Sequence, residues 1–226
     1  MKTYLQWIFA LSSDLIIQLL TYFFLLPASF FFQLKSRKKR KKPLLLIHGY
    51  CHFSLVWWFY FWKLKKHFGP IYTVNLGSPL KSIPDYAKKV EKILPLEESW
   101  TLVGHSMGGL VSTYLAIHSE YKDRIIKIIT MASPFHGTKI AHLGFGKCAR
   151  QMETGSSFIK KLEQEKKKLS LPIYYLATKQ DQIAIPYETA LPEKDPSKEK
   201  VLEGVGHVGL LLSDEALRQV KSWITE

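Results

Sequence analysis

The segment Leu102-Val103-Gly104-His105-Ser106-Met107-Gly108-Gly109-Leu110 is the most informative part of the chain. The apolar run 101–103 before it has the composition of a buried strand, and the stretch 107–119 after it has that of a helix. Gly-x-Ser-x-Gly between a strand and a helix holds a serine hydroxyl in a sharp turn above the edge of a sheet. We expect glycine at 104 and 108 because a side chain there would collide with neighbouring backbone. Ser106 is therefore a candidate nucleophile.

Strand-like and helix-like segments alternate through the rest of the chain, from Pro43 to the C-terminus. Several of the strand candidates are apolar at consecutive positions, as expected for strands that are buried on both faces of a parallel sheet. The pattern predicts a doubly wound, mostly parallel α/β sheet of about six strands. The predicted strands are 44–47, 71–74, 101–103, 125–131, 173–177 and 200–202, and the predicted helices are 55–66, 84–94, 107–119, 156–168 and 214–224.

A serine hydroxyl needs a general base that takes its proton. In this kind of fold the acid and the histidine follow the serine in that order, each on a loop after a later strand. His207 lies between glycines just after the last predicted strand, and Asp181 follows the strand before it. Asp123 comes too early in the chain and Asp214 comes after the histidine. The predicted triad is Ser106, Asp181 and His207.

An oxyanion intermediate needs two backbone N–H groups that point at the developing negative charge. The residue after the nucleophile, Met107, supplies one of them. The loop after the first predicted strand reads Leu46-Ile47-His48-Gly49-Tyr50. We expect the second N–H group from Tyr50.

Together these motifs resemble a lipase or esterase of the α/β-hydrolase superfamily. The residues that carry the resemblance are His48–Tyr50, Gly104–Gly109, Ala132–Thr138, Asp181 and His207. The chain is similar to small bacterial lipases and to lipase-like deacylases that remove acyl chains from glycolipids. The resemblance covers essentially residues 43–226, and it implies a minimal version of the fold that acts on acyl esters. There is little room for a large lid, for which 139–154 is the one candidate segment.

The expected activity is hydrolysis of a carboxylic ester with a lipid or hydrophobic acyl group, through an acyl-enzyme intermediate. An acyltransferase would use the same triad, and a catalytically idle membrane scaffold would keep the fold without using it. This chemistry requires no cofactor and no metal ion. The basic balance, +13 in net charge, is not accompanied by a nucleic-acid-binding motif, so no nucleic-acid partner is expected. Substrate identity and oligomeric state stay open.

The first 42 residues differ from the rest, because they are apolar and then strongly basic. Residues 1–34 are long enough for a membrane anchor, and 35–42 form a basic juxtamembrane segment of the kind that favours the cytoplasmic face. The expected layout is a single-pass anchor followed by a catalytic domain, 43–226, that lies in the cytoplasm. A cleaved signal peptide and a helix that lies flat in the membrane interface are the alternatives.

Six consecutive aromatic residues, 57–62, fall within one predicted helix. Because a helix turns about 100° per residue, such a run cannot face a core on one side only. The exposed rings would either dock on a membrane or acyl group, or lie under the N-terminal segment. The two cysteines, Cys51 and Cys148, do not reveal from sequence whether they pair.

Overall fold

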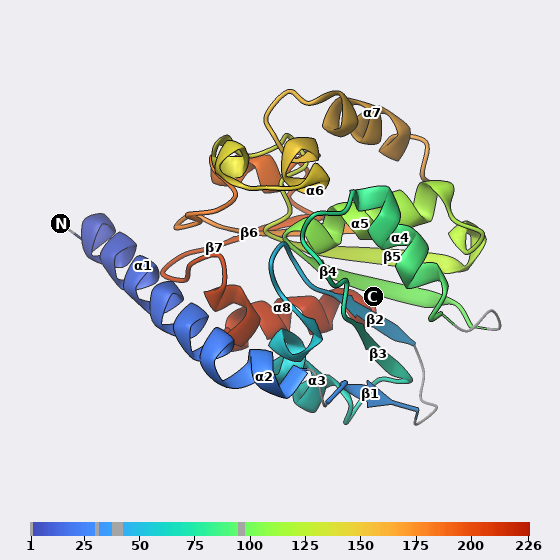
Figure 1. The fold of residues 1–226 in the computed structure, drawn as a ribbon, viewed down its shortest axis with the longest axis horizontal. Coiled ribbons are helices and arrows are strands. Elements are labelled where there is room, and N and C mark those ends of the chain that lie inside the picture. Colours follow the sequence, from blue (N-terminus) through green and yellow to red (C-terminus); the bar gives the residue numbers. More distant parts are fainter. Residues whose placement is uncertain (1, 30–31, 38–42, 95–97) are drawn as a thin grey trace.

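The computed structural model describes residues 2–29, 32–37, 43–94 and 98–226 and contains a single twisted sheet with helices on both faces (Figure 1). The seven strands have the order β1-β3-β2-β4-β5-β6-β7. Strands β2 to β7 are parallel to their neighbours, and β1 is antiparallel to β3. The strands are β1 (Lys35–Ser36), β2 (Leu44–Ile47), β3 (Ile71–Val74), β4 (Trp100–His105), β5 (Ile125–Met131), β6 (Ile173–Thr178) and β7 (Glu199–Leu202).

The predicted fold class is confirmed, since each of the predicted strands matches one of β2 to β7. The short edge strand β1 was not expected, because its residues lie in the segment interpreted as a basic linker. It pairs with Ile71 and Tyr72 of β3. The α-helices are α1 (Lys2–Leu20), α2 (Leu26–Ser29), α3 (Trp58–Leu64), α4 (Ile83–Glu91), α5 (Met107–His118), α6 (Lys147–Gln151), α7 (Ser157–Lys166) and α8 (Asp214–Thr225).

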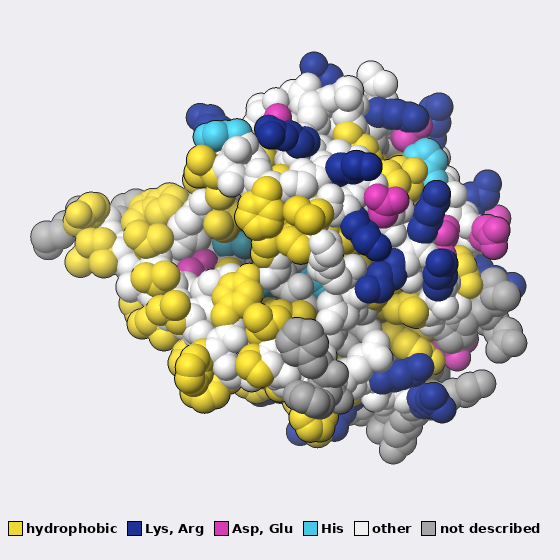
Figure 2. All heavy atoms as spheres, in the orientation of Figure 1, with side chains coloured by type: hydrophobic (Ala, Val, Ile, Leu, Met, Phe, Trp, Pro, Cys, Tyr) yellow, Lys and Arg dark blue, Asp and Glu magenta, His cyan; other side chains and the backbone are white. Residues whose placement is uncertain are grey.

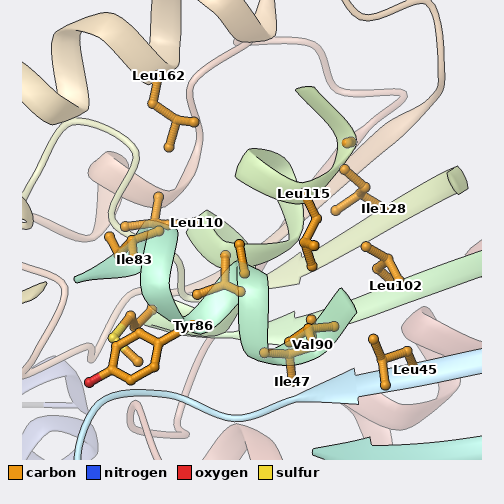
Figure 3. Close-up of a cluster of buried hydrophobic side chains, with 14 of the residues drawn as sticks. Leu45, Ile47, Ile83, Tyr86, Val90, Leu102, Leu110, Leu115, Ile128 and Leu162 are labelled. Atoms are coloured by element: carbon orange, nitrogen blue, oxygen red, sulfur yellow. The ribbon is translucent and has the colours of Figure 1, made fainter. Parts of the chain in front are cut away.

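The sheet separates two hydrophobic cores. Along β2, Leu45 and Ile47 belong to one core and Leu44 and Leu46 to the other, and all four side chains are buried. This alternation follows from the two-residue period of a strand. Helices α4, α5, α6 and α7 contribute to the first core (Figure 3), and α3 and α8 contribute to the second.

Local sequence signals define the ends of several helices. The Ser82 side chain accepts a hydrogen bond from the Asp85 backbone N–H at the start of α4, and the Asp85 carboxylate accepts one from the Ser82 N–H. This reciprocal capping satisfies two N–H groups that a helix leaves without partners. The side chains of Ser156 and Ser213 likewise accept a backbone hydrogen bond at the starts of α7 and α8, but without the reciprocal bond. Helix α4 therefore starts one residue before the predicted range.

The N-terminal segment is packed onto this fold along its second half. Ile17 of α1, with Tyr22 and Leu25 of the π-helical turn Thr21–Leu25 that follows it, packs against the second core. Most of the other large apolar side chains of α1 are exposed, so the helix has one docked face and one apolar outer face. The range Tyr4–Ser29 is long and apolar enough to cross a membrane. The predicted basic segment lies partly outside the described residues, because 38–42 are not among them.

The aromatic run is divided between the core and the surface. Trp57, Tyr60 and Phe61 are buried in the second core, whereas Trp58 is 41% and Trp62 54% exposed. The expectation that some rings must face outward is thus confirmed. Cys51 and Cys148 are both free thiols.

Candidate active site

Ser106 occupies a strained turn between β4 and α5. Its backbone has φ 55° and ψ −126°, a conformation that side-chain-bearing residues rarely adopt. A Cβ atom on Gly104 would lie 2.4 Å from the Gly109 nitrogen, and one on Gly108 would lie 2.2 Å from the Ile47 oxygen. Both glycines are therefore required by close approach of backbone, as the sequence pattern predicts. The turn holds the Ser106 side chain at the carboxyl edge of the sheet.

Asp181 and His207 form a buried pair beside this turn. Both oxygens of the Asp181 carboxylate lie 2.9 Å from His207 Nδ1. The carboxylate is itself held in place, because its Oδ1 accepts hydrogen bonds from the backbone N–H groups of Ile183 (2.8 Å) and Ala184 (2.6 Å). The carboxylate accepts a hydrogen bond from the Nδ1–H group of the ring, so Nε2 is left as the basic nitrogen.

The other contact that a triad needs is the one between the His207 ring and the Ser106 hydroxyl. Both residues line one pocket, but among the described residues the Ser106 hydroxyl makes no hydrogen bond to the His207 ring. Catalytic hydrogen bonds of this kind are often long until a substrate is bound. The structure brings together the three side chains that the sequence predicts as a triad.

The loop that carries Gly49 and Tyr50 lies directly against Ser106. A Cβ atom on Gly49 would be only 2.8 Å from the Ser106 Cβ. The buried His48 ring fixes this loop, because its Nδ1 donates to the Gly49 oxygen (2.8 Å) and its Nε2 accepts from the Leu76 N–H (2.9 Å). Burial lowers the pKa of His48 to about 4, so the ring is neutral at neutral pH and serves both roles. Of the two residues predicted to donate N–H groups, Met107 directly follows Ser106 at the start of α5, and Tyr50 lines the same pocket as Ser106.

Two further buried histidines surround His207, and sequence reasoning gave neither a role. The His105 Nε2 contacts the His207 backbone oxygen at 3.0 Å, and the His52 ring stacks on the His105 ring. Burial lowers the pKa of His52 to about 3 and that of His105 well below its usual range. These rings are thus neutral and add no positive charge beside His207.

Asp14 is a site residue that sequence reasoning missed. Its carboxylate, on α1, accepts hydrogen bonds from the backbone N–H groups of Val208 (2.9 Å) and Gly209 (2.8 Å), directly after His207. A Cβ atom on Gly206 would lie 2.4 Å from this carboxylate, so the loop fits closely around it. The one acidic residue within an apolar segment was the signal that could have identified it.

Two pockets meet at Ser106. The larger, of about 340 Å³, lies between α1 and the loops that carry His52, Gln182 and His207. The smaller, of about 250 Å³, lies beneath the segment 139–152 and is lined by apolar side chains that include Ile140, Leu143 and Met152. Tyr50, Ser106 and Ile183 line both. Over the described ranges, no three His, Cys, Asp or Glu side chains are grouped so as to hold a metal ion.

Fold and site geometry define this protein as an α/β hydrolase of the lipase and esterase type. The chain belongs to the PGAP1-like alpha/beta domain family, which matches residues 72–185.

Two solved structures with the same fold are lipases. The mature form of the Bacillus licheniformis lipase BlEst2 superimposes with a TM-score of 0.68 and 17% identity over 85% of this chain and 97% of that chain. The Paleococcus ferrophilus monoacylglycerol lipase gives a TM-score of 0.66 and 16% identity, again over 85% of this chain and 97% of that one. At this level of identity the likeness concerns the fold.

Pimeloyl-[acyl-carrier protein] methyl ester esterases from Vibrio are similar in sequence. The Vibrio vulnificus enzyme is 31% identical over 96 residues, which are 40% of this chain and 36% of the enzyme. The Vibrio cholerae enzyme is 33% identical over 97 residues. The match spans about a third of these relatives' length.

Proposed function

We propose that this hydrolase cleaves carboxylic esters by nucleophilic catalysis, with Ser106 as the nucleophile, His207 as the general base and Asp181 as its orienting acid. The observation that carries the proposal is the buried Asp181–His207 pair, whose His207 lines one pocket together with a serine held on a strained turn. The two predicted oxyanion donors, the N–H groups of Tyr50 and Met107, complete the proposed set of catalytic groups.

The reaction has two halves. Ser106 Oγ attacks the carbonyl carbon while its proton passes to His207 Nε2, and the N–H groups of Tyr50 and Met107 stabilise the negative oxygen. The carbon–oxygen bond to the alcohol then breaks, and His207 returns the proton to the departing oxygen. Water attacks the acyl-enzyme through the same base and releases a carboxylic acid and free Ser106. No metal ion or cofactor takes part in these steps.

The substrate is a hydrophobic acyl ester. The lining surface of both pockets beside Ser106 is mainly apolar, and burying it against an acyl or alkyl chain is favourable. An acyltransferase would share the first half of the reaction and replace water with an alcohol or amine. Product analysis with and without added acceptor distinguishes the two.

The decisive experiment compares the wild-type protein with Ser106→Ala in detergent, on esters of short to long fatty acids. We expect serine-dependent turnover and labelling of the wild-type protein alone by a fluorophosphonate. A protein that neither hydrolyses any ester nor is labelled would be a scaffold, and the proposed function would be wrong.

The N-terminal segment attaches this hydrolase to a membrane. The outer face of α1 is apolar and Lys35 and Arg37 follow it, which is the composition of a membrane anchor with its basic end on the cytoplasmic side. Ala10 of α1 is fully buried and Leu11 lines the pocket, so only residues 2–9, roughly 8 residues or about 12 Å, are free to enter the bilayer. That is shorter than the ~30 Å core, so the docked state favours a helix embedded in one leaflet over a spanning one.

Protease digestion of vesicles tests this arrangement. With the hydrolase domain, 43–226, on the cytoplasmic side, externally added protease cleaves it in inside-out vesicles and leaves it intact in right-side-out ones. The reverse pattern would contradict the orientation. Cleavage within residues 2–9 from the opposite side would show that the helix spans.

A further inference from the structure

We propose that His105, His52 and Gln18 are positioning residues for His207, and that through them and Asp14 the N-terminal helix α1 is a working part of the active site. This inference rests on the proposed function and adds to it the residues that hold its general base. Two buried histidines that take no part in proton transfer thereby have a function.

The loop that carries His207 needs support from outside. It spans residues 203–209 and contains glycine at positions 204, 206 and 209. Glycine leaves the backbone free to adopt many conformations, and Gly204 has a φ of 76°. During the reaction the His207 ring must keep Nδ1 on Asp181 and Nε2 toward Ser106 while its charge changes. Contacts from other elements therefore have to fix the backbone at His207.

Three contacts hold this backbone on both sides of the ring. The His207 N–H donates to Gln182 Oε1 at 3.1 Å, and the His207 oxygen accepts from His105 Nε2 at 3.0 Å. The next two N–H groups of the chain donate to the Asp14 carboxylate. Gln182 is the neighbour of Asp181, whereas His105 and Asp14 belong to β4 and α1. Two of the three supports thus come from elements far away in the sequence.

His105 is suited to be a neutral donor. It is the last residue of β4, precedes Ser106 and is fully buried. Its Nδ1 has no hydrogen-bond partner among the described residues, so the ring carries its proton on Nε2, where the His207 oxygen accepts it. The centroids of the His105 and His207 rings lie only 4.7 Å apart. Because a cation this close would oppose the positive charge that His207 acquires, a ring that burial keeps neutral is the appropriate support.

His52 joins His105 to α1. The two rings stack with an interplanar angle of 14° and centroids 6.2 Å apart. The His52 Nε2 donates to Gln18 Oε1 at 3.2 Å, and its Nδ1 is buried without a partner in the described part of the chain. Gln18 follows Asp14 by one helical turn, so the two side chains share the docked face of α1. The helix therefore holds the His207 loop directly through Asp14 and indirectly through two stacked rings.

Helix α1 also borders the opening of the site. In Figure 2, hydrophobic side chains cover the N-terminal helix and border a central hollow in which histidine atoms are visible. Four residues of α1, one of them Gln18, line the larger pocket together with Ser106 and His207. A shift of α1 away from the domain would remove the Asp14 and Gln18 contacts at once. The docked helix is thus needed for the productive position of His207.

The test measures the turnover of each site and the pKa of His207 separately, on the full-length protein in detergent. The rate at which a fluorophosphonate labels Ser106 rises as His207 loses its proton, so its pH dependence gives the pKa of His207. Labelling to completion counts the correctly folded sites, and kcat is expressed per labelled site. The titratable side chains around His207 are Asp181 after β6, Asp14 of α1, His105 of β4, and Tyr50, Cys51 and His52 of the loop after β2.

The variants separate a donor from a ring. His105→Phe keeps a ring and removes the donor, whereas His105→Gln keeps a side-chain N–H group. Gln18→Met removes the acceptor on α1. Gln6→Met is the matched control, because Gln6 lies on the same helix, is half-buried, and its side chain makes no hydrogen bond to any described residue.

We expect His105→Phe to reduce kcat per labelled site by about tenfold to a hundredfold, with little change in KM. The pKa of His207 should fall, because the ring loses its alignment with the Asp181 carboxylate that stabilises its charged form. His105→Gln should recover most of both losses. Gln18→Met should lower kcat about fivefold, the equivalent of one hydrogen bond. Combined with His105→Phe it should cause no further loss, and Gln6→Met should match the wild-type protein.

A merely structural role for His105 would lower the number of labelled sites or the unfolding temperature and leave kcat per site and the pKa of His207 unchanged. That result would refute the positioning role while the proposed function stands. Additive losses in the double variant would show that Gln18 does not act through His105. If the wild-type protein is not labelled and its turnover does not depend on Ser106, both proposals are wrong.

Discussion

The Asp181 carboxylate holds the His207 ring through both of its oxygens and is in turn held by two backbone N–H groups. An uncharged amide in its place would present an N–H group to the ring and favour the wrong tautomer. We expect Asp181→Asn to reduce kcat by about ten-thousandfold with little change in the thermal unfolding midpoint. Ester turnover of Asp181→Asn and of the exposed control Asp123→Asn checks this. Near-normal turnover of Asp181→Asn would remove Asp181 from the triad.

The buried histidines make the fold sensitive to acid. The folded-state pKa values of His48 and His52, about 4 and about 3, lie below the unfolded value of 6.5. The unfolded chain therefore binds more protons than the native one as the pH falls below 6.5, and stability is lost in that direction. For each ring, the free energy of unfolding should fall by about 2 kcal/mol between about pH 7 and about pH 5.

Urea unfolding of the wild-type protein and His52→Gln at the two pH values measures this effect. The variant should lose about 2 kcal/mol less than the wild-type protein over the same interval. His67→Gln, at an exposed position, should behave like the wild-type protein. An equal pH dependence in all three would show that His52 is not buried in its neutral form.

At the scale of elements, the turn between β4 and α5 depends on backbone contact with β2. A methyl group on Gly108 would sit 2.2 Å from the Ile47 oxygen, and that oxygen belongs to a strand that cannot yield without disturbing the sheet. We expect Gly108→Ala to destabilise the protein by about 3 kcal/mol or more, as overpacking in a closed site does. Gly155→Ala, where the backbone φ is 78° but no atom lies within 4 Å, should cost only about 1 kcal/mol. Comparable unfolding midpoints for the two variants would contradict the contact.

The strands and helices of the sheet could be predicted because their signals are local. Runs such as Leu44–Ile47 are apolar at every position. The helix cap at Ser82–Asp85 is formed within four consecutive residues. The short helix α6 and strand β1 could not be predicted, since their residues have no clear period. They form because tertiary contacts hold them: the Cys148 N–H of α6 donates to the Lys81 oxygen, and Ser36 pairs with Ile71.

For the whole molecule, the contact between α1 and the loop after His207 joins the apolar N-terminal helix to the candidate active site. Removal of the Asp14 carboxylate leaves the N–H groups of Val208 and Gly209 buried without acceptors. We expect Asp14→Ala to lower the free energy of unfolding by about 1–3 kcal/mol and to reduce kcat through misplacement of His207. Asp14→Asn, which keeps one acceptor, should recover part of both losses. Ser12→Ala on the exposed side of α1 is the control, and wild-type kcat in Asp14→Ala would contradict the coupling.

The parallel sheet, the turn at Ser106 and the chain order of Ser106, Asp181 and His207 could be predicted from the amino-acid sequence alone. Those features are encoded by neighbouring residues and by the order of strands, and both can be read along the chain. The folded structure was needed to show that α1 is docked, that Asp14 contacts Val208 across 194 residues and that two pockets share Ser106. These are long-range contacts between side chains and backbone whose partners have no fixed spacing, and they come together only when the sheet and its helices have packed.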